Sequence, residues 1–247
     1  MKISVVTVCY NEENTIRATV ESVLGQTYDD LEYLIMDGAS KDGTLDIISE
    51  YSNDSRMKCC SEPDTGLYDA MNKALARISG EYVIFMNSGD MFYDNDVLSD
   101  IAPALDADIV YGDVYRRSSS GDFTDRYKGT HFERMRMMLS GLAFCHQTQF
   151  TKTSLMREYG FRESHKITAD YDFVVRALAA KRSFKHVDRL VCSFDQDGGI
   201  SADMGNYRRM IQEDDASIRE FFPFLYYLTF IPKTMFRICF RKEYHAK

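Results

Sequence analysis

Polar and acidic side chains follow three apolar segments of this 247-residue chain, at the point where each segment ends. The turn Asn87-Ser88-Gly89-Asp90 comes directly after the apolar run 82–86. Short apolar, β-branched runs predict buried strands, and ligands of open α/β sheets bind at the carboxyl ends of the strands. Mg²⁺ needs one or two carboxylates and takes its other ligands from water and phosphate. The position of Asp90 directly after the run 82–86 therefore predicts a site for a hard cation.

The same design appears upstream, where Tyr10-Asn11-Glu12 follows the run 3–9 and Asp37 follows the run 31–36. Apolar residues at helical spacing separate the runs, in segments 16–25, 45–48 and 67–75. Alternation of strands and helices predicts an α/β fold with a parallel sheet and crossover helices. We expect one domain over 1–222, made of two halves, 1–115 and 116–222. The segment 116–122 (RRSSSGD) is predicted to be a loop.

Composition narrows the class of protein. The formal net charge of −8 disfavours a nucleic-acid backbone as a partner. Six cysteines show no C-x-x-C pair and no zinc-finger spacing, which favours reduced thiols in the cytoplasm. We expect no signal peptide, because the first apolar run is short and meets Asn11 and Glu12 at once.

The segment 223–247 has a different character, rich in aromatic residues and bases. Lys233, Arg237 and Arg241 recur at a spacing of four, so they share one face of a helix. Its apolar run is far shorter than the ~20 residues of a transmembrane helix. The pattern predicts an amphipathic helical tail at a membrane surface. The alternative is a helix packed on the core or on a second copy of the chain in a homodimer.

Nucleotide-binding signatures such as G-x-G-x-x-G and G-x-x-x-x-G-K-[ST] are absent. Four other segments occur in order between residues 5 and 178: VVTVCYNEENTIRATVESVLGQTY, LIMDGASKDGT, EPDTGLYDAMNKALARISGEYVIFMNSGD and TADYDFVVRAL. In these segments the chain resembles glycosyltransferase family 2, the inverting enzymes of the GT-A fold, and within it bacterial enzymes that build surface polysaccharides. The resemblance runs from residue 3 to about residue 207. The resemblance implies a Rossmann-like, mixed and mainly parallel sheet flanked by helices.

The resemblance also implies that 1–115 is the nucleotide-sugar half of the domain and 116–222 the acceptor half. It further implies a set of residues that bind the nucleotide-sugar donor. Asp37 would receive the base, usually uracil, and charge-assisted bonds to a carboxylate are strong ones. The alternative for Asp37 is a turn residue, and for Asp64 it is a helix N-cap. The full set is Thr7, Tyr10, Asn11, Glu12, Asp37, Asp64, Gly66, Asn72, Asn87, Ser88 and Gly89.

Asn87-Ser88-Gly89-Asp90 takes the place of the family's D-x-D metal motif, with Asn87 where the leading acid stands. Asp90 would then hold Mg²⁺ or Mn²⁺, and the alternative is an ordinary strand-ending turn. The catalytic base would be Asp170, where Ala169 replaces the usual first acid of a pair. Asp172 is the second choice, with a role at a helix N-terminus as its alternative.

His146 and Gln147 resemble a family position on the acceptor or diphosphate side, although a lone histidine is more often structural. Gly199 and Ser201 lie in a glycine-containing loop that could fold over the diphosphate, whose backbone N–H groups suit an anion. Arg208 and Arg209 follow this loop. They could pair with diphosphate oxygens, or they could be charged residues on the surface of a helix.

The resemblance implies a metal-dependent, hexosyltransferase-type enzyme of polysaccharide biosynthesis, peripheral at the inner face of the cell membrane. It would move a sugar from a nucleotide-diphosphate sugar, with a UDP-sugar as the first expectation, to a saccharide or lipid-linked saccharide acceptor. A catalytically weak sugar-nucleotide-binding or scaffold subunit is the alternative, favoured by the reduced metal motif. A nucleotidyltransferase is disfavoured, because no basic, Gly-rich loop follows the first strand.

Overall fold

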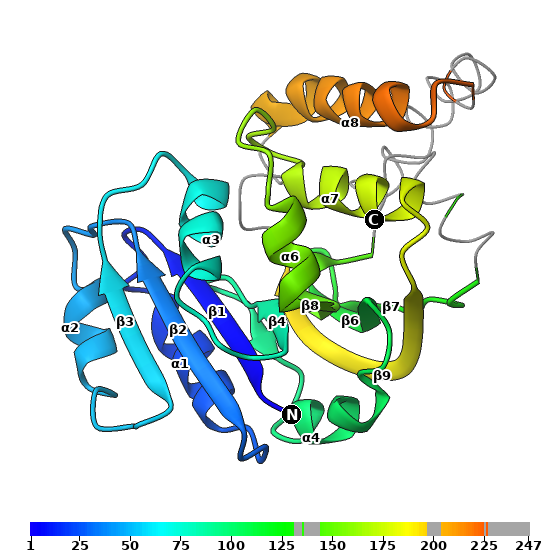
Figure 1. Cartoon of the computed structure of the whole chain (residues 1–247). Helices are drawn as coiled ribbons and strands as arrows, with labels where there is room; N and C mark the ends of the chain where they lie inside the picture. Colours follow the sequence, from blue (N-terminus) through cyan, green and yellow to red (C-terminus); the bar gives the residue numbers. More distant parts are fainter. Residues whose placement is uncertain (131–134, 136–143, 197–203, 225, 227–247) are drawn as a thin grey trace.

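The computed structural model describes residues 1–130, 135, 144–196, 204–224 and 226. A mixed sheet runs through the molecule in the strand order β3-β2-β1-β4-β8-β6-β9-β5, with β7 paired to β6. The parallel half contains β1 (Ile3–Cys9), β2 (Leu31–Asp37), β3 (Met57–Ser61) and β4 (Tyr82–Phe85). Figure 1 shows these strands beside the second half of the chain. The predicted α/β class with a mixed sheet is confirmed.

The second half of the sheet mixes antiparallel and parallel strand pairs. Strand β8 (Gln149–Lys152) is antiparallel to both β4 and β6 (Ile109–Arg117). Strand β9 (Phe184–Asp195) is parallel to β6 and antiparallel to β5 (Met91–Phe92), and β7 (Phe123–Asp125) is antiparallel to β6. The loop predicted from residue 116 is wrong at its start, because Arg116 and Arg117 belong to β6.

Side chains alternate between the two faces of the sheet, as the pleat of a strand requires. In β1, Val5 packs into one core cluster and Val6 into the other. The first cluster is covered by α1 (Ile16–Leu24), α2 (Thr44–Ser49) and α4 (Val97–Ile101). The second is covered by α3 (Leu67–Leu75), α6 (Thr153–Tyr159) and α7 (Ala169–Ala179). Burial on both faces explains why the parallel strands read as continuous apolar runs.

Helix α8 (Tyr207–Phe221) packs on α7 and forms the outermost layer of this half (Figure 1). Three short 3₁₀ helices complete the described elements, η1 (Ala102–Ala104), η2 (His146–Thr148) and η3 (Met204–Asn206). Of the predicted tail 223–247, only 223, 224 and 226 are among the described residues, so the predicted amphipathic helix lies outside them. In the part of the chain that is described, no helix is both long and apolar enough to cross a bilayer.

Candidate active site

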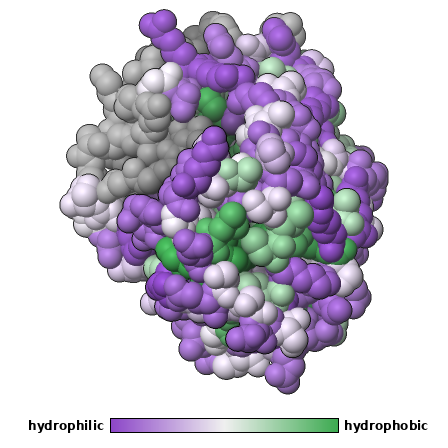
Figure 2. Space-filling model, turned by 90° about the vertical axis from the view of Figure 1, so that its left-hand side faces the viewer, coloured by the Kyte–Doolittle hydropathy of each residue, from purple (hydrophilic) through white to green (hydrophobic). Residues whose placement is uncertain are grey.

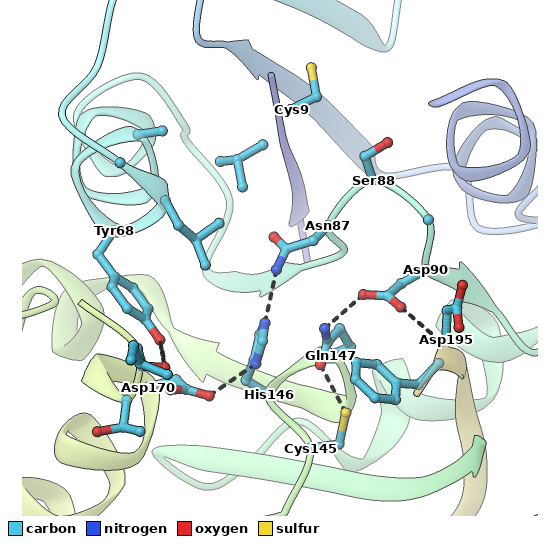
Figure 3. A pocket seen from close by; sticks show the side chains of 18 of the residues that line it. Cys9, Tyr68, Asn87, Ser88, Asp90, Cys145, His146, Gln147, Asp170 and Asp195 are labelled. Carbon is cyan, nitrogen blue, oxygen red and sulfur yellow. Dashed lines mark hydrogen bonds and ion pairs between the residues drawn. The ribbon is translucent and has the colours of Figure 1, made fainter. Parts of the chain in front are cut away.

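A cavity of about 610 Å³ opens where β1 and β4 end. Its walls also come from the start of α3, from η2, from the start of α7, from the end of β9 and from α8. Both predicted halves of the chain therefore line one cavity, which Figure 3 shows from close by. Most of the predicted site residues lie on it: Tyr10, Glu12, Asp64, Gly66, Asn87, Ser88, Gly89, Asp90, His146, Gln147 and Asp170.

Asp90 stands at the inner end of the turn after β4 and is only 6% exposed. Its two carboxylate oxygens accept hydrogen bonds from Gln147 Nε2 (2.7 Å) and from the backbone N–H of Asp195 (3.2 Å). Burial raises the pKa of Asp90 to about 6, because a buried carboxylate loses its hydration. A cation beside this carboxylate would offset that cost.

The side chains around Asp90 that could act as metal ligands determine which kind of metal site they can form. Within the described ranges, no group of three or more His, Cys, Asp or Glu side chains is arranged to hold a metal ion. Glu12 and Asp195 line the same cavity as Asp90, and Figure 3 shows the Asp195 side chain beside Asp90. The residues therefore fit a cation held jointly by one or two carboxylates, water and phosphate oxygens. They do not fit one enclosed by protein ligands alone.

Asp170 lies at the start of α7, across the cavity from Asp90. Its Oδ1 is 2.9 Å from the Tyr68 hydroxyl and its Oδ2 is 3.1 Å from His146 Nδ1. Burial acts to raise the pKa of Asp170, but the hydrogen bond and charge of His146 outweigh it and lower the pKa below the ordinary aspartate value. Burial likewise opposes protonation of His146, yet its bond to Asp170 raises the histidine pKa overall. Asp170 is thus an ionised carboxylate at neutral pH, ready to accept a proton.

Two neighbouring residues of η2 form hydrogen bonds with the two cavity carboxylates, Asp170 and Asp90. His146 contacts Asp170, whereas Gln147 donates to Asp90. The Gln147 amide is oriented by Cys145, whose thiol donates to Oε1 over 2.8 Å. Gln147 must therefore present Nε2 to Asp90. The predicted HQ pair lies between the two carboxylates and contacts both.

Asp172, the second choice for the base, does not lie on the cavity. It is fully buried, 2.8 Å from Arg176 Nε and 2.9 Å from Ser217 Oγ. A carboxylate held in this way joins α7 to α8 and has no access to a substrate. That expectation is corrected, and Asp170 remains the candidate base.

Four residues expected on the donor side support the cavity without lining it. Asp37 is 1% exposed and accepts hydrogen bonds from Ser61 Oγ and from the backbone N–H of Ser40, which is the turn role left open above. Thr7 is fully buried. Asn11 accepts a bond from the Lys41 backbone, and the Asn72 side chain bonds the backbone of Phe161 in both directions.

The loop before α3 is organised by glycine. Gly66 has φ +132°, a backbone conformation that side chains disfavour, and it is the N-cap residue of α3. Asp64 is therefore not the helix cap, and its Oδ1 instead accepts the Gly66 N–H at 2.8 Å. A Cβ on Gly38 would lie 2.6 Å from Asp64 Oδ2. The absence of a side chain at position 38 lets this loop fold over the end of β2.

Few large apolar side chains are exposed. In the described parts of the chain these are Met1, Tyr10, Tyr93 and Phe224. On the face that carries β3 and α2, hydrophobic residues gather in one band amid hydrophilic surface (Figure 2).

Tyr10 is 57% exposed and lies at the cavity. An exposed ring at a cavity rim suits a planar ligand.

Sequence reasoning missed several residues that line the cavity. Asp195 ends β9, so the same strand-end rule that found Asp90 applies to it. Arg116 lines the cavity while pairing with Asp125, but its segment was interpreted as a loop. Tyr68 sits at the start of α3, directly after the predicted Asp64 and Gly66. Gly199 and Ser201 lie outside the described residues.

Comparison with known proteins places the chain in a family. A sequence profile described as "Glycosyl transferase family 2" matches residues 4–160, more than half of the chain. The protein belongs to glycosyltransferase family 2. A glycosyltransferase of Mycobacterium tuberculosis named as uncharacterized is 30% identical over 217 residues, covering 84% of this chain and 82% of its own. A "PGL/p-HBAD biosynthesis glycosyltransferase" of Mycobacterium bovis is 29% identical over 208 residues, covering 80% and 78%.

Solved structures show the same fold in this family 2 glycosyltransferase. Staphylococcus aureus TarS 1-349 in complex with UDP-GlcNAc superposes with a TM-score of 0.72 at 22% identity, covering 89% of this chain and 67% of that one. A mannosyltransferase of Pyrobaculum calidifontis in complex with GDP-Man and Mn²⁺ gives a TM-score of 0.66 at 17% identity, covering 89% and 64%. The predicted family and fold are both confirmed.

Proposed function

We propose that this glycosyltransferase moves a sugar from a nucleotide-diphosphate sugar, in the first instance a UDP-sugar, to a hydroxyl of a saccharide or lipid-linked saccharide. One observation carries the proposal: Asp90 and Asp170 open on one cavity, with Gln147 and His146 bonded to them. A similar structure holds UDP-GlcNAc, which supports a UDP-sugar here. Because the proposed acceptor is a saccharide, the proposal includes a role in polysaccharide biosynthesis.

The proposed reaction is a single displacement at the anomeric carbon. The acceptor oxygen forms the new bond to this carbon while its proton passes to Asp170. The bond to the nucleoside diphosphate breaks on the opposite face, and the diphosphate leaves as an anion, so the anomeric configuration inverts. General-base help of this kind typically contributes ~10²–10⁴-fold.

The other residues bind and orient the donor. Tyr10, Glu12 and Asp64 lie on the nucleotide side of the cavity. Asp90, with Asp195 beside it, would hold Mg²⁺ or Mn²⁺, and such an ion supplies Lewis-acid stabilisation of the diphosphate. Gln147 keeps the Asp90 carboxylate aimed at the cavity.

Nucleotide binding and turnover test the proposal together. Thermal unfolding would be measured with UDP, GDP, CDP or dTDP, each with and without Mn²⁺. We expect UDP with Mn²⁺ to give the largest rise in melting temperature. Transfer would then be followed by NMR, and a product that keeps the anomeric configuration of the donor would refute the mechanism. Nucleotide binding without any turnover would favour the binding-subunit alternative.

Where the protein works in the cell is a separate part of the proposal. The basic, aromatic segment 223–247 would place it at the inner face of the cell membrane, or would join two copies of the chain. Of the residues described near this segment, Phe222 and Tyr226 pack with Ile218 on the α7–α8 pair. The segment therefore leaves the fold next to the helix that carries Asp170. Vesicle co-sedimentation of the full chain and of a form ending at residue 226 distinguishes the two roles.

A further inference from the structure

Side chains from α3, α7, η2 and the turn after β4 form a continuous row of hydrogen bonds along the cavity. On one side, the Tyr68 hydroxyl reaches Asp170 Oδ1 at 2.9 Å, and His146 Nδ1 reaches Oδ2 at 3.1 Å. On the other side, His146 Nε2 lies 3.1 Å from Nδ2 of Asn87. The row thus joins the turn that contains Asp90 to the candidate base (Figure 3).

The partners of His146 fix where its ring carries a proton. An amide nitrogen only donates, so Nε2 accepts from Asn87 and the ring proton sits on Nδ1, pointing at Asp170. In this orientation Asn87 Oδ1 is buried with no hydrogen-bond partner. A half-turn of the amide would bring that oxygen to Nε2, where it accepts the N–H of an imidazolium. In both arrangements His146 donates from Nδ1 to the carboxylate.

We propose that His146 is a positioning residue for Asp170 and that Asn87, bonded to Nε2, holds the ring in the orientation that aims Nδ1 at this carboxylate. The inference rests on the proposed function, because it presupposes Asp170 as the base. The Tyr68 hydroxyl lies 2.8 Å from the Ile167 carbonyl as well as 2.9 Å from Asp170 Oδ1, so its one proton is shared between two acceptors. The Nδ1–H of His146 is then the donor that restrains the rotation of the carboxylate and keeps its remaining lone pairs oriented relative to the cavity. Orientation of this kind is a large share of what a catalytic group contributes.

The identity of residue 87 gains a physical reason from this arrangement. An aspartate here would only accept, and would hold His146 as an imidazolium by bonding Nε2–H. Asparagine can donate to a neutral Nε2 or accept from a protonated one, so it holds the ring in either protonation state with Nδ1–H toward Asp170. The amide that takes the place of the leading acid of the metal motif therefore bonds the residue that orients the base.

Two substitutions of His146 separate positioning from mere packing. In His146→Asn the amide nitrogen falls near the place of Nδ1 and keeps a donor for Asp170. In His146→Gln it reaches the place of Nε2, so the contact with Asn87 persists and the donor to Asp170 is lost. His186→Asn is the matched control: His186 bonds the buried Asp113 through Nε2 at 2.8 Å outside the cavity, and an asparagine amide does not reach the place of Nε2.

The assay measures release of nucleoside diphosphate from UDP-glucose, UDP-N-acetylglucosamine and UDP-galactose with Mn²⁺, beside thermal unfolding of each variant. We expect kcat to fall about 10- to 100-fold in His146→Gln, the range for one hydrogen bond to a charged group. It should fall less than about 5-fold in His146→Asn, with the KM for the donor unchanged in both. His186→Asn should lose stability but keep kcat.

Equal kcat in the Asn and Gln variants, with Asp170→Asn inactive, would overturn the positioning role while leaving the proposed function intact. A wild-type enzyme inactive on every donor, or an Asp170→Asn variant as active as wild type, would overturn the proposed function and this inference with it. If His146→Gln does not fold, Asn87→Leu takes its place: kcat should fall, and an unaltered kcat would refute the contribution of the hydrogen bonds that link Asn87 to His146 and His146 to Asp170.

Discussion

Replacing Asp90 by asparagine should stabilise the metal-free protein while abolishing its turnover. Asp90 is 6% exposed, and burial raises its pKa from the ordinary 3.8 to about 6. Above pH 6 the folded protein therefore carries an ionised carboxylate that the unfolded chain would hydrate better. At about 1.4 kcal/mol per pH unit, the rise corresponds to roughly 3 kcal/mol of lost stability at pH 8.

The sign of this cost sets its pH dependence. Because the pKa in the folded state lies above the unfolded value, the folded protein binds the proton more tightly. The cost is complete above about pH 6 and fades as the pH falls toward 4. Asparagine is neutral throughout and can still accept a bond from Gln147, although its own amide needs a new acceptor. We expect a net gain of about 1–3 kcal/mol at pH 8 and less than about 1 kcal/mol at pH 4.

Urea unfolding of wild type and Asp90→Asn in EDTA, at pH 8 and at pH 4, measures the two free energies. A variant that is no more stable than wild type at pH 8 would refute the reasoning from burial. Thermal unfolding with UDP and Mn²⁺ at pH 8 then tests the metal assignment. Wild type should gain in melting temperature over UDP alone, and an equal gain in Asp90→Asn would show that the ion is held elsewhere.

Three further substitutions have distinct expected outcomes. Asp170→Asn should lower kcat by about 10²–10⁴-fold without changing the UDP-induced thermal shift, since a general base is lost but the nucleotide side is untouched; an unchanged kcat would contradict the role. Asp172→Asn should cost about 3–5 kcal/mol in urea unfolding, because it leaves Arg176 without its buried partner, and kcat per folded molecule should stay the same. Gly66→Ala should cost about 1–3 kcal/mol through backbone strain alone, because a Cβ there meets nothing within 4 Å; no loss in denaturation would show that the loop adapts freely.

The expectation that polar residues directly after an apolar strand line the site was correct where the strand itself can be recognised in the sequence. Apolar runs of strand length are visible in sequence because the parallel strands are buried on both faces, and the residue after each run is then known. Asp195 was missed because β9 does not read as such a run. It contains Asp188 and Arg189, and most of its residues are only partly buried. A mostly half-buried strand leaves no continuous apolar pattern to recognise.

The direction in which a carboxylate points depends on neighbours that the sequence does not reveal. Asp37 follows its run just as Asp90 follows another, but Asp37 pairs in register with Ser61 of β3, whose hydroxyl binds it. For Asp172 one signal was present: Arg176 stands four residues later, at the spacing of a helical ion pair. That spacing favours a structural role and separates Asp172 from Asp170.

The arrangement of η2 explains why the two halves of the chain act on one reaction. His146 and Gln147 are consecutive, yet one bonds an acid at the start of α7 and the other bonds an acid after β4. A displacement of this single turn would move the carboxylate proposed to take the proton and the one proposed to face the diphosphate together. A change confined to α3 affects only Asp170, which Tyr68 contacts, and a change confined to β9 affects only Asp90, which the Asp195 backbone contacts. A perturbation of η2 should therefore lower kcat and the Mn²⁺ response in parallel, whereas loss of Tyr68 should lower kcat alone.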